Sequence, residues 1–283
     1  MANNVIIKQL EKDAFDMRIN ILKMCCEIEG PMHIGGDLSI VDIMTALFKY
    51  KLNINPDDAK MPSRDRFILS KGHCAAAMYV IMAMCGFFDM DELCHTYGKL
   101  DSKFGMHPCK ERLPELECSS GSLGHGLSIG VGKALAAKID NESYRTYVLL
   151  GDGELQEGSN WEAAMSAAYY KLGNLVAVVD NNKLQLDGCI SDVMEIEPLK
   201  DKWLAFGWNV MSIDGHNMNE IVTALDKIPS SNTTVPTVII CRTVKGKGVS
   251  FMENQPQWHA GSIDESVLEK CIADLKETYE KGE

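Results

Sequence analysis

Residues 146–182 read TYVLLGDGELQEGSNWEAAMSAAYYKLGNLVAVVDNN, and the architecture of the whole chain follows from this segment. Two short apolar runs, 146–150 and 175–180, flank a segment with helical periodicity near 160–171. Short β-rich runs that alternate with helices are typical of parallel strands joined by crossover helices. The segment therefore predicts a strand–helix–strand unit.

The remainder of the chain extends this unit in both directions. We expect further strands near 208–213 and 237–242, and helices at 5–26, 39–52, 72–84, 127–139, 199–206, 218–228 and 262–281. Asp89 followed by Glu92 resembles a capping box that opens one more short helix. Residues 99–122 show no period, and an irregular segment of that length is usually functional. The expected fold class is α/β, a doubly wound, mainly parallel sheet with helices on both faces, formed by a single domain over residues 1–283.

The composition narrows the class of protein. The 283 residues carry a formal charge of −12, which argues against nucleic acid or an anionic membrane as the main partner. No apolar run approaches the ~20 residues that span a bilayer, and the N-terminus lacks the apolar core of a signal peptide. The ten cysteines include no C-x-x-C pair, so free thiols in a reducing compartment are expected. We expect a soluble, cytoplasmic protein.

Two polar side chains follow neighbouring strands of the predicted unit. Asp152 comes directly after the first strand, and Asn182 follows the second strand thirty positions later. Because the carboxyl ends of parallel strands meet at one edge of the sheet, the two side chains should lie close together. Both offer oxygen, the ligand that Mg²⁺ or Ca²⁺ prefers, although water, backbone carbonyls and phosphate must complete such a site. A G-D-G sequence can also be an ordinary turn, but the pair at this spacing favours a functional site.

This pair also carries a family resemblance. G-D-G followed about thirty residues later by N-N resembles the thiamine-diphosphate fingerprint, and the whole segment looks like the diphosphate-binding half of a transketolase. The resemblance extends to four other segments in the expected order: HIGGDLSIVDIMTALF, DRFILSKGHCAAAMY, GMHPCKERLPELECSSGSLGHGLSIGVGKALA and TVKGKGVSFMENQPQWHAG. These segments span most of the chain and imply a thiamine-diphosphate-binding fold of the diphosphate-binding type.

The resemblance implies that the cofactors are thiamine diphosphate and Mg²⁺, with Ca²⁺ as an alternative metal. It also assigns a role to individual residues. The metal ligands would be Asp152, Asn182 and the carbonyl of Leu184. Gly153, His73 and His259 would contact the diphosphate of the cofactor, and Asn182 would bind it through the metal. Gly121 would contact the cofactor by its backbone, while the side chains of Leu123 and Leu186 would pack on its rings. Glu157 would link two cofactor sites at a subunit interface.

Histidines are the expected catalytic residues. The resemblance places His33, His107 and His259 against the sugar carbons, where imidazole can bind hydroxyls and move protons near neutral pH. We interpret His95 and His216 as structural, and the sequence does not decide the role of His125. The sequence leaves two other features open. The segment Lys245-Gly-Lys-Gly248 either contacts a phosphate or forms a solvated loop. Departures from the family pattern, such as Asp37, leave open which sugar is the substrate.

The chain is about half as long as a full member of the family that it resembles. Full transketolases are about twice as long, and a second, pyrimidine-binding domain completes their cofactor site. The resemblance therefore implies an N-terminal subunit that needs a separately encoded C-terminal subunit, with a two-plus-two heterotetramer as the expected assembly. The expected activity is transfer of a two-carbon ketol unit from a ketose phosphate to an aldose phosphate in the pentose phosphate pathway. The alternatives are a specialised pentulose or sulfosugar transketolase subunit, and a non-catalytic scaffold or regulatory protein with the same fold.

Overall fold

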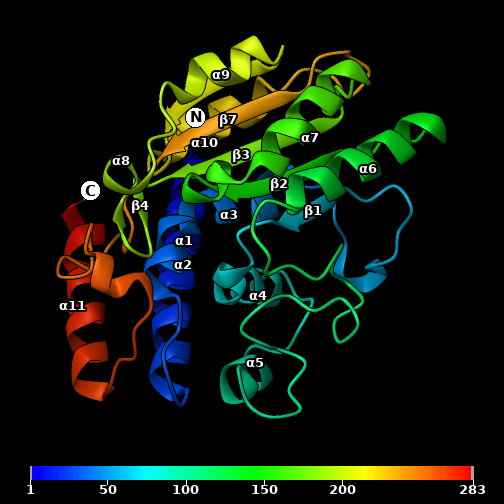
Figure 1. Cartoon of the computed structure of the whole chain (residues 1–283). Coiled ribbons are helices and arrows are strands. Elements are labelled where there is room, and N and C mark those ends of the chain that lie inside the picture. The colour runs from blue at the N-terminus through cyan, green and yellow to red at the C-terminus, as the bar shows by residue number, and fades with distance from the viewer. Residues whose placement is uncertain (1, 282–283) are drawn as a thin grey trace.

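A five-stranded parallel sheet forms the centre of the molecule in the computed structural model, which describes residues 2–281 (Figure 1). Its strands are β1 (Arg66–Leu69), β2 (Thr146–Gly151), β3 (Leu175–Asn181), β6 (Asn209–Asp214) and β7 (Thr237–Arg242). They lie in the order β1-β2-β3-β7-β6, and every neighbouring pair is parallel. The α/β fold with a mainly parallel sheet is therefore confirmed.

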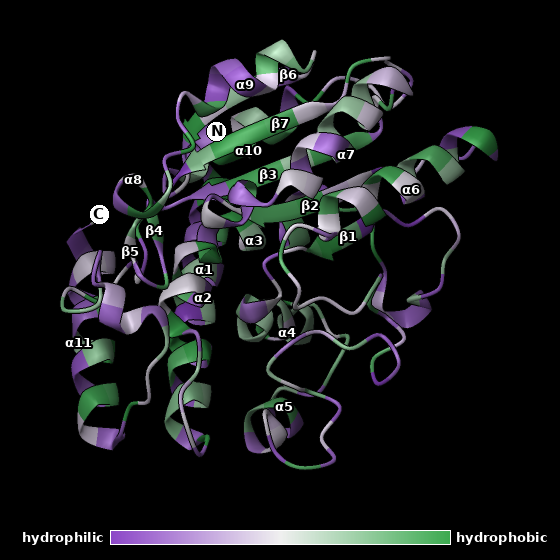
Figure 2. Ribbon diagram, viewed as in Figure 1, coloured by the Kyte–Doolittle hydropathy of each residue, from purple (hydrophilic) through white to green (hydrophobic). Residues whose placement is uncertain are grey.

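Helices cover both faces of this sheet because alternate strand residues point to opposite sides. Val148 and Leu150 of β2 join one buried cluster, whereas Tyr147 and Leu149 join another. The first cluster lies under α6 (Gly126–Ile139), α7 (Gly158–Tyr169) and α9 (Leu199–Ala205), and the second under α1 (Ala2–Glu27), α3 (Val41–Ala46), α4 (Ala75–Met84) and α10 (Met218–Asp226). Figure 2 shows the strands as an apolar centre between these two layers. The doubly wound arrangement matches the prediction.

Smaller elements complete the chain. They are α2 (Ile34–Ser39), α5 (Met90–Thr96), α8 (Ile190–Val193), α11 (Glu265–Lys281) and a short antiparallel hairpin of β4 (Leu184–Gln185) and β5 (Gly188–Cys189). The Asp89 carboxylate accepts the Glu92 amide hydrogen at the start of α5, as the capping pattern predicts. Residues 99–122 form neither helix nor strand, again as expected. Within residues 2–281 no helix has both the length and the apolar character that crossing a membrane requires.

Two local features differ from the sequence-based expectations. Strand β1 was not predicted, because it is only four residues long and pairs with β2, which lies about eighty positions later in the chain. The expected helix over 39–52 is broken: α2 ends at Ser39, α3 starts at Val41, and a wider π-type turn covers Leu47–Lys51. The Ser39 hydroxyl lies 2.7 Å from a carboxylate oxygen of Asp180. This side-chain contact with the end of β3 accompanies the break.

Candidate functional site

Four histidines from distant segments form one cluster at the carboxyl edge of the sheet. His33 precedes α2, His73 lies in the turn before α4, His107 belongs to the irregular segment 99–122, and His259 lies in the turn before α11. The ring centroid of His33 is 5.4 Å from that of His73, 6.0 Å from that of His107 and 5.5 Å from that of His259. The rings of His73 and His259 are stacked 5.7 Å apart. The structure thus brings together all four histidines that the family resemblance singles out.

Close backbone contacts hold this cluster together. A Cβ atom on Gly72 would lie 2.8 Å from the backbone carbonyl oxygen of Ser120, so the turn that carries His73 packs directly on the segment that carries His107. A Cβ on Gly36 would lie 2.9 Å from the sulfur of Cys74. Glycine is required at position 72, because a Cβ there would meet the Ser120 backbone, whereas at position 36 the close atom belongs to a side chain.

The three predicted metal ligands lie beside the cluster. The Asp152 carboxylate accepts the backbone amides of Gly153 (2.9 Å) and Lys183 (2.6 Å), which ties the end of β2 to the residue after Asn182. The side-chain oxygen of Asn182 accepts the Leu184 amide at 3.0 Å. One carboxylate, one amide and one carbonyl are the oxygen donors that Mg²⁺ accepts when phosphate completes its shell. Across residues 2–281 no set of three His, Cys, Asp or Glu side chains is arranged to hold a metal, so a cation at this edge depends on that mixed donor set.

The raised pKa of Asp152 supports the binding of a cation at this site. The side chain is 1% exposed, and burial together with the nearby charge of Asp180 raises its pKa to about 7. Within residues 2–281 this carboxylate accepts two amide hydrogens and lies near the charge of Lys71, but burial still outweighs these contacts, and a divalent cation would stabilise its charged form. The residues present therefore fit a divalent metal.

Two buried lysines supply positive charge; the sequence interpretation did not name Lys71 and left the role of Lys245 open. Lys71 follows β1 and forms an ion pair with Asp180. Lys245 follows β7; its ammonium nitrogen lies 2.8 Å from Nδ1 of His259 and donates to the Leu184 carbonyl at 3.4 Å. Lys245 is 3% exposed, so the solvated-loop alternative is wrong for this residue. The signal that could have found both is their position, since each lies within three residues of the carboxyl end of a sheet strand.

Burial, together with the charge of these lysines, lowers the pKa of three of the histidines. Burial and the Lys245 ammonium lower the pKa of His259 to about 4. Burial and the charge of Lys71 hold the pKa of His73 well below its ordinary value, and burial lowers the pKa of His33. Near neutral pH the imidazoles of His33, His73 and His259 are therefore neutral, and the positive charge lies on the lysines. Neutral imidazoles can both accept and donate hydrogen bonds, as hydroxyl recognition and proton transfer require.

The glycine turn at 121–124 is attached to the same edge by a buried carboxylate. Glu154 accepts the amides of Gly124 (2.9 Å) and Gly151 (3.1 Å) and the hydroxyl of Ser70, so it joins the turn to the ends of β1 and β2. The sequence interpretation missed Glu154, although it directly follows the G-D-G motif.

The other predicted cofactor contacts surround this edge. A Cβ on Gly121 would lie 3.4 Å from the His107 ring, and one on Gly153 would lie 3.1 Å from Gln185. Leu123 and Leu186 are large apolar side chains that remain 37% and 64% exposed. Their exposure leaves apolar surface free to cover a ring system or another chain. Glu157 is exposed at the start of α7.

The remaining histidines lie outside the cluster. His95 is exposed and contacts the Asp91 carbonyl at 2.7 Å. Both ring nitrogens of His216 make hydrogen bonds within the protein, which agrees with its structural interpretation. His125 is exposed just before α6, and its contacts assign it no role.

Asp37 should make stability depend on pH. Among the described residues its Oδ2 has no hydrogen-bond partner, and burial raises its pKa to about 8. The folded chain holds this proton at a pH where the unfolded chain, with an ordinary pKa near 4, has released it. The free energy of unfolding should therefore fall as pH rises from about 4 to about 8.

We expect Asp37→Asn to raise the free energy of unfolding at pH 8 by roughly 2 kcal/mol, and much less at pH 5. The amide keeps the oxygen that accepts the Ala77 amide at 2.9 Å. Urea unfolding at both pH values measures the difference, and Asp140→Asn at an exposed position is the control. An equal effect of Asp37→Asn at pH 5 and pH 8 would contradict a raised pKa.

Comparison with known proteins identifies the relatives of this chain. A family model described as the transketolase thiamine diphosphate binding domain matches residues 18–279. The chain is 45% identical to one of the subunits of apulose-4-phosphate transketolase from Phocaeicola vulgatus, over 89% of this chain and 88% of the relative. It is 40% identical to 6-deoxy-6-sulfo-D-fructose transketolase subunit SqwG of Clostridium sp., over 87% and 89% of the two chains.

Solved structures of transketolases have the same fold as this chain. The chain superposes on transketolase from Campylobacter jejuni with a TM-score of 0.86 and 28% identity, covering 95% of this chain and 43% of the other. It therefore spans less than half the length of that solved protein.

Proposed function

Because the chain belongs to the family of the transketolase thiamine diphosphate binding domain, we propose that it is the N-terminal subunit of a heteromeric, Mg²⁺-dependent transketolase. One observation carries this proposal: neutral histidines, buried lysines and a mixed set of oxygen donors converge at the carboxyl edge of one parallel sheet. Ligands of open α/β sheets bind at this edge. A protein that served only as a scaffold would not need that combination.

The residues divide between the two ends of the cofactor. Asp152, Asn182 and the Leu184 carbonyl would hold Mg²⁺, while the diphosphate would lie against Gly153, His73, His259 and the two lysines. Leu123 and Leu186 would face the rings, and Gly121 would approach by its backbone. When bound, thiamine diphosphate supplies a nucleophilic carbon and an electron sink for breaking a carbon–carbon bond beside a carbonyl.

The chain's own histidines would handle the sugar. His33, His107 and His259 would bind its hydroxyl groups, and the short distances between their rings support a shared role. A neutral imidazole can take a proton from one hydroxyl and return it to another. His107 is exposed, so it is accessible to an incoming sugar. We infer transfer of a two-carbon ketol unit from a ketose phosphate to an aldose phosphate in the cytoplasm.

A specialised sugar is the second candidate. Two relatives of similar length are named for apulose 4-phosphate and for 6-deoxy-6-sulfo-D-fructose, which favours this possibility over the pentose phosphate pathway. The reconstituted enzyme should be compared with each of these donors and with a xylulose phosphate. The donor with the highest kcat/KM then separates the two candidates.

The proposed enzyme includes a second chain, and mixing the two chains tests the proposal. Relatives that are named as transketolase subunits, together with the exposed Leu123 and Leu186, support a separately encoded C-terminal, pyrimidine-binding subunit, with a heterotetramer as the assembly. We expect no ketol transfer from this chain alone and restored transfer on mixing it with such a subunit. Coupled detection of the aldose product measures activity, and analytical ultracentrifugation measures the assembly. Full activity of the chain alone would contradict the need for a partner, whereas an inactive but stable complex would favour the scaffold alternative.

A further inference from the structure

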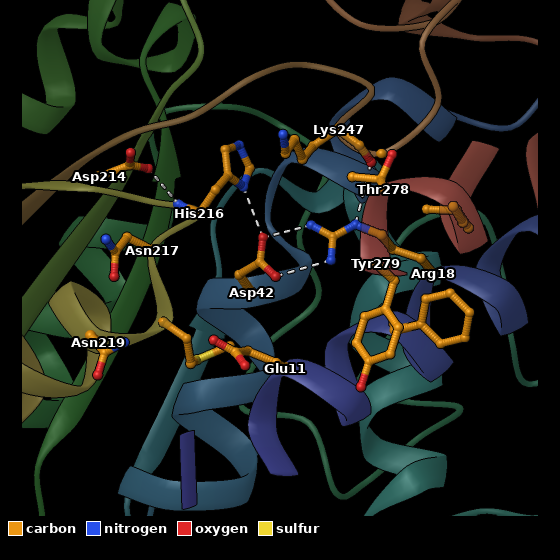
Figure 3. Close-up of a pocket in the computed structure, with 14 residues that line it drawn as sticks. Glu11, Arg18, Asp42, Asp214, His216, Asn217, Asn219, Lys247, Thr278 and Tyr279 are labelled. Atoms are coloured by element: carbon orange, nitrogen blue, oxygen red, sulfur yellow. Dashed lines mark hydrogen bonds and ion pairs between the residues drawn. The ribbon is translucent and has the colours of Figure 1, made fainter. Parts of the chain in front are cut away.

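A cavity of about 510 Å³ lies beside residues 243–248, the segment that follows β7 (Figure 3). Arg18, Asp42, His216 and Lys247 are among its lining residues. The same segment carries Lys245, which contacts His259 in the histidine cluster. Residues 243–248 therefore have one side chain in the cavity and another in the candidate active site.

Three side chains form a connected network in this cavity. The two terminal nitrogens of Arg18 donate to the two carboxylate oxygens of Asp42 at 3.0 Å and 2.6 Å. Nδ1 of His216 lies 2.8 Å from Oδ2 of Asp42, as the dashed line in Figure 3 marks. The side chains of Arg18, Asp42 and His216 are only 10%, 10% and 13% exposed. Such a buried, paired and hydrogen-bonded network holds its members in fixed positions.

The network determines the tautomer of His216. Its Nε2 accepts the backbone amide hydrogen of Val244 at 2.8 Å. Because a backbone amide can only donate, Nε2 carries no proton, and the ring proton lies on Nδ1 facing Asp42. A carboxylate that fixes the tautomer of a histidine is a common way to orient the other ring nitrogen.

The segment 243–248 is consequently fixed on both sides of Lys245. His216 holds Val244, and Nε of Arg18 donates to the Lys247 carbonyl at 3.3 Å. Between them, the Gly246 amide donates to the Gly35 carbonyl at 2.9 Å, two residues after His33. With its backbone held at these three points, the Lys245 side chain reaches both His259 and the Leu184 carbonyl.

We propose that His216, oriented by Asp42, is a positioning residue that places the Lys245 ammonium for contact with the diphosphate of thiamine diphosphate. This proposal rests on the proposed function for its ligand. It rests on the structure alone for the contact between Lys245 and His259, so the two parts can be tested separately.

The test compares His216→Leu with His216→Gln in the full chain. Leucine cannot accept the Val244 amide hydrogen, whereas the glutamine oxygen can accept it and the glutamine amide can donate to Asp42. His95→Leu, at an exposed histidine, is the matched control. The first readout is the ¹⁵N resonance pair of the His259 ring in the cofactor-free chain, which reports on the Lys245 contact. The second is the affinity for thiamine diphosphate in Mg²⁺.

We expect His216→Leu to shift the His259 signals and to weaken cofactor binding about tenfold, the lower end of the range for residues that orient a ligand-binding group. His216→Gln should restore both readouts, and His95→Leu should change neither. Unshifted His259 signals in His216→Leu, or equal losses in the Leu and Gln variants, would overturn the proposal.

The wild-type chain provides a test that needs no variant. The proposal requires the Nδ1–H tautomer of His216 in long-range ¹H–¹⁵N spectra, and an Nε2–H tautomer would overturn it even if His216→Leu does not fold. If the wild-type chain failed to bind thiamine diphosphate even together with its C-terminal partner subunit, the proposed function would fall, while the His259 signals would still decide whether His216 places Lys245.

Discussion

Replacing Asp152 by alanine should abolish Mg²⁺-dependent binding of thiamine diphosphate. Asp152 is the one carboxylate in the proposed donor set, and the remaining amide and carbonyl oxygens carry no charge to hold a divalent cation. Replacing a residue that only orients a metal ligand typically lowers metal affinity about ten- to a hundredfold. Loss of the ligand carboxylate itself should therefore weaken binding by at least about a hundredfold. Calorimetric titration of the cofactor at fixed Mg²⁺ measures the effect.

The Asp152→Ala variant should nevertheless fold. The carboxylate is buried with a pKa raised to about 7, so its removal relieves a desolvation penalty that offsets the loss of two amide hydrogen bonds. Asp140→Ala, an exposed carboxylate at the end of α6, is the control and should bind normally. Unchanged cofactor affinity in a folded Asp152→Ala chain would place the metal site elsewhere.

Replacing Lys245 by methionine should also weaken cofactor binding strongly. The ammonium is buried beside His259, and a charge-assisted contact with a diphosphate is worth about 1.5–3 kcal/mol, or about ten- to a hundredfold in affinity. The same substitution at Lys247, two positions away and lining the cavity in Figure 3, is the matched control. Equal losses in the two variants would show that the charge of the segment matters and not the position of Lys245.

The pH dependence of binding gives this prediction a second readout. Burial and the charge of Lys71 lower the pKa of Lys245 to about 8. An anion binds the protonated form, so the free chain must take up a proton on binding once the pH exceeds about 8. Affinity for thiamine diphosphate should therefore fall above pH 8 in the wild type, and this fall should be smaller in Lys245→Met. Titrations at pH 7, 8 and 9 measure both curves.

Local patterns predicted much of this molecule because parallel strands impose a simple geometry. The runs at 146–150 and 175–180 became β2 and β3, and their ends placed Asp152 and Asn182 at one edge, as the spacing indicated. Strand β7 covers 237–242 as expected. Burial on both faces makes such strands continuously apolar, which is a property that the sequence records directly.

Contacts between distant segments were less predictable. Strand β1 carries too short an apolar run to be recognised without β2 beside it. No local pattern in the sequence marks Glu154, yet its carboxylate accepts hydrogen bonds from Ser70, Gly124 and Gly151. The environment of a charged side chain depends on what packs around it, and two of the three partners here, Ser70 and Gly124, lie tens of positions away.

The order of residues was enough to predict the alternation of strands and helices, the pair of oxygen donors at the strand ends and, through the family resemblance, the four histidines beside them. The folded chain was needed to show that Lys71 and Lys245 are buried beside that cluster, that His73 and His259 are neutral there, and that His216 holds the segment carrying Lys245. This division arises because periodicity and spacing are encoded locally. Burial and charge state depend instead on desolvation by residues that come together only when the chain folds.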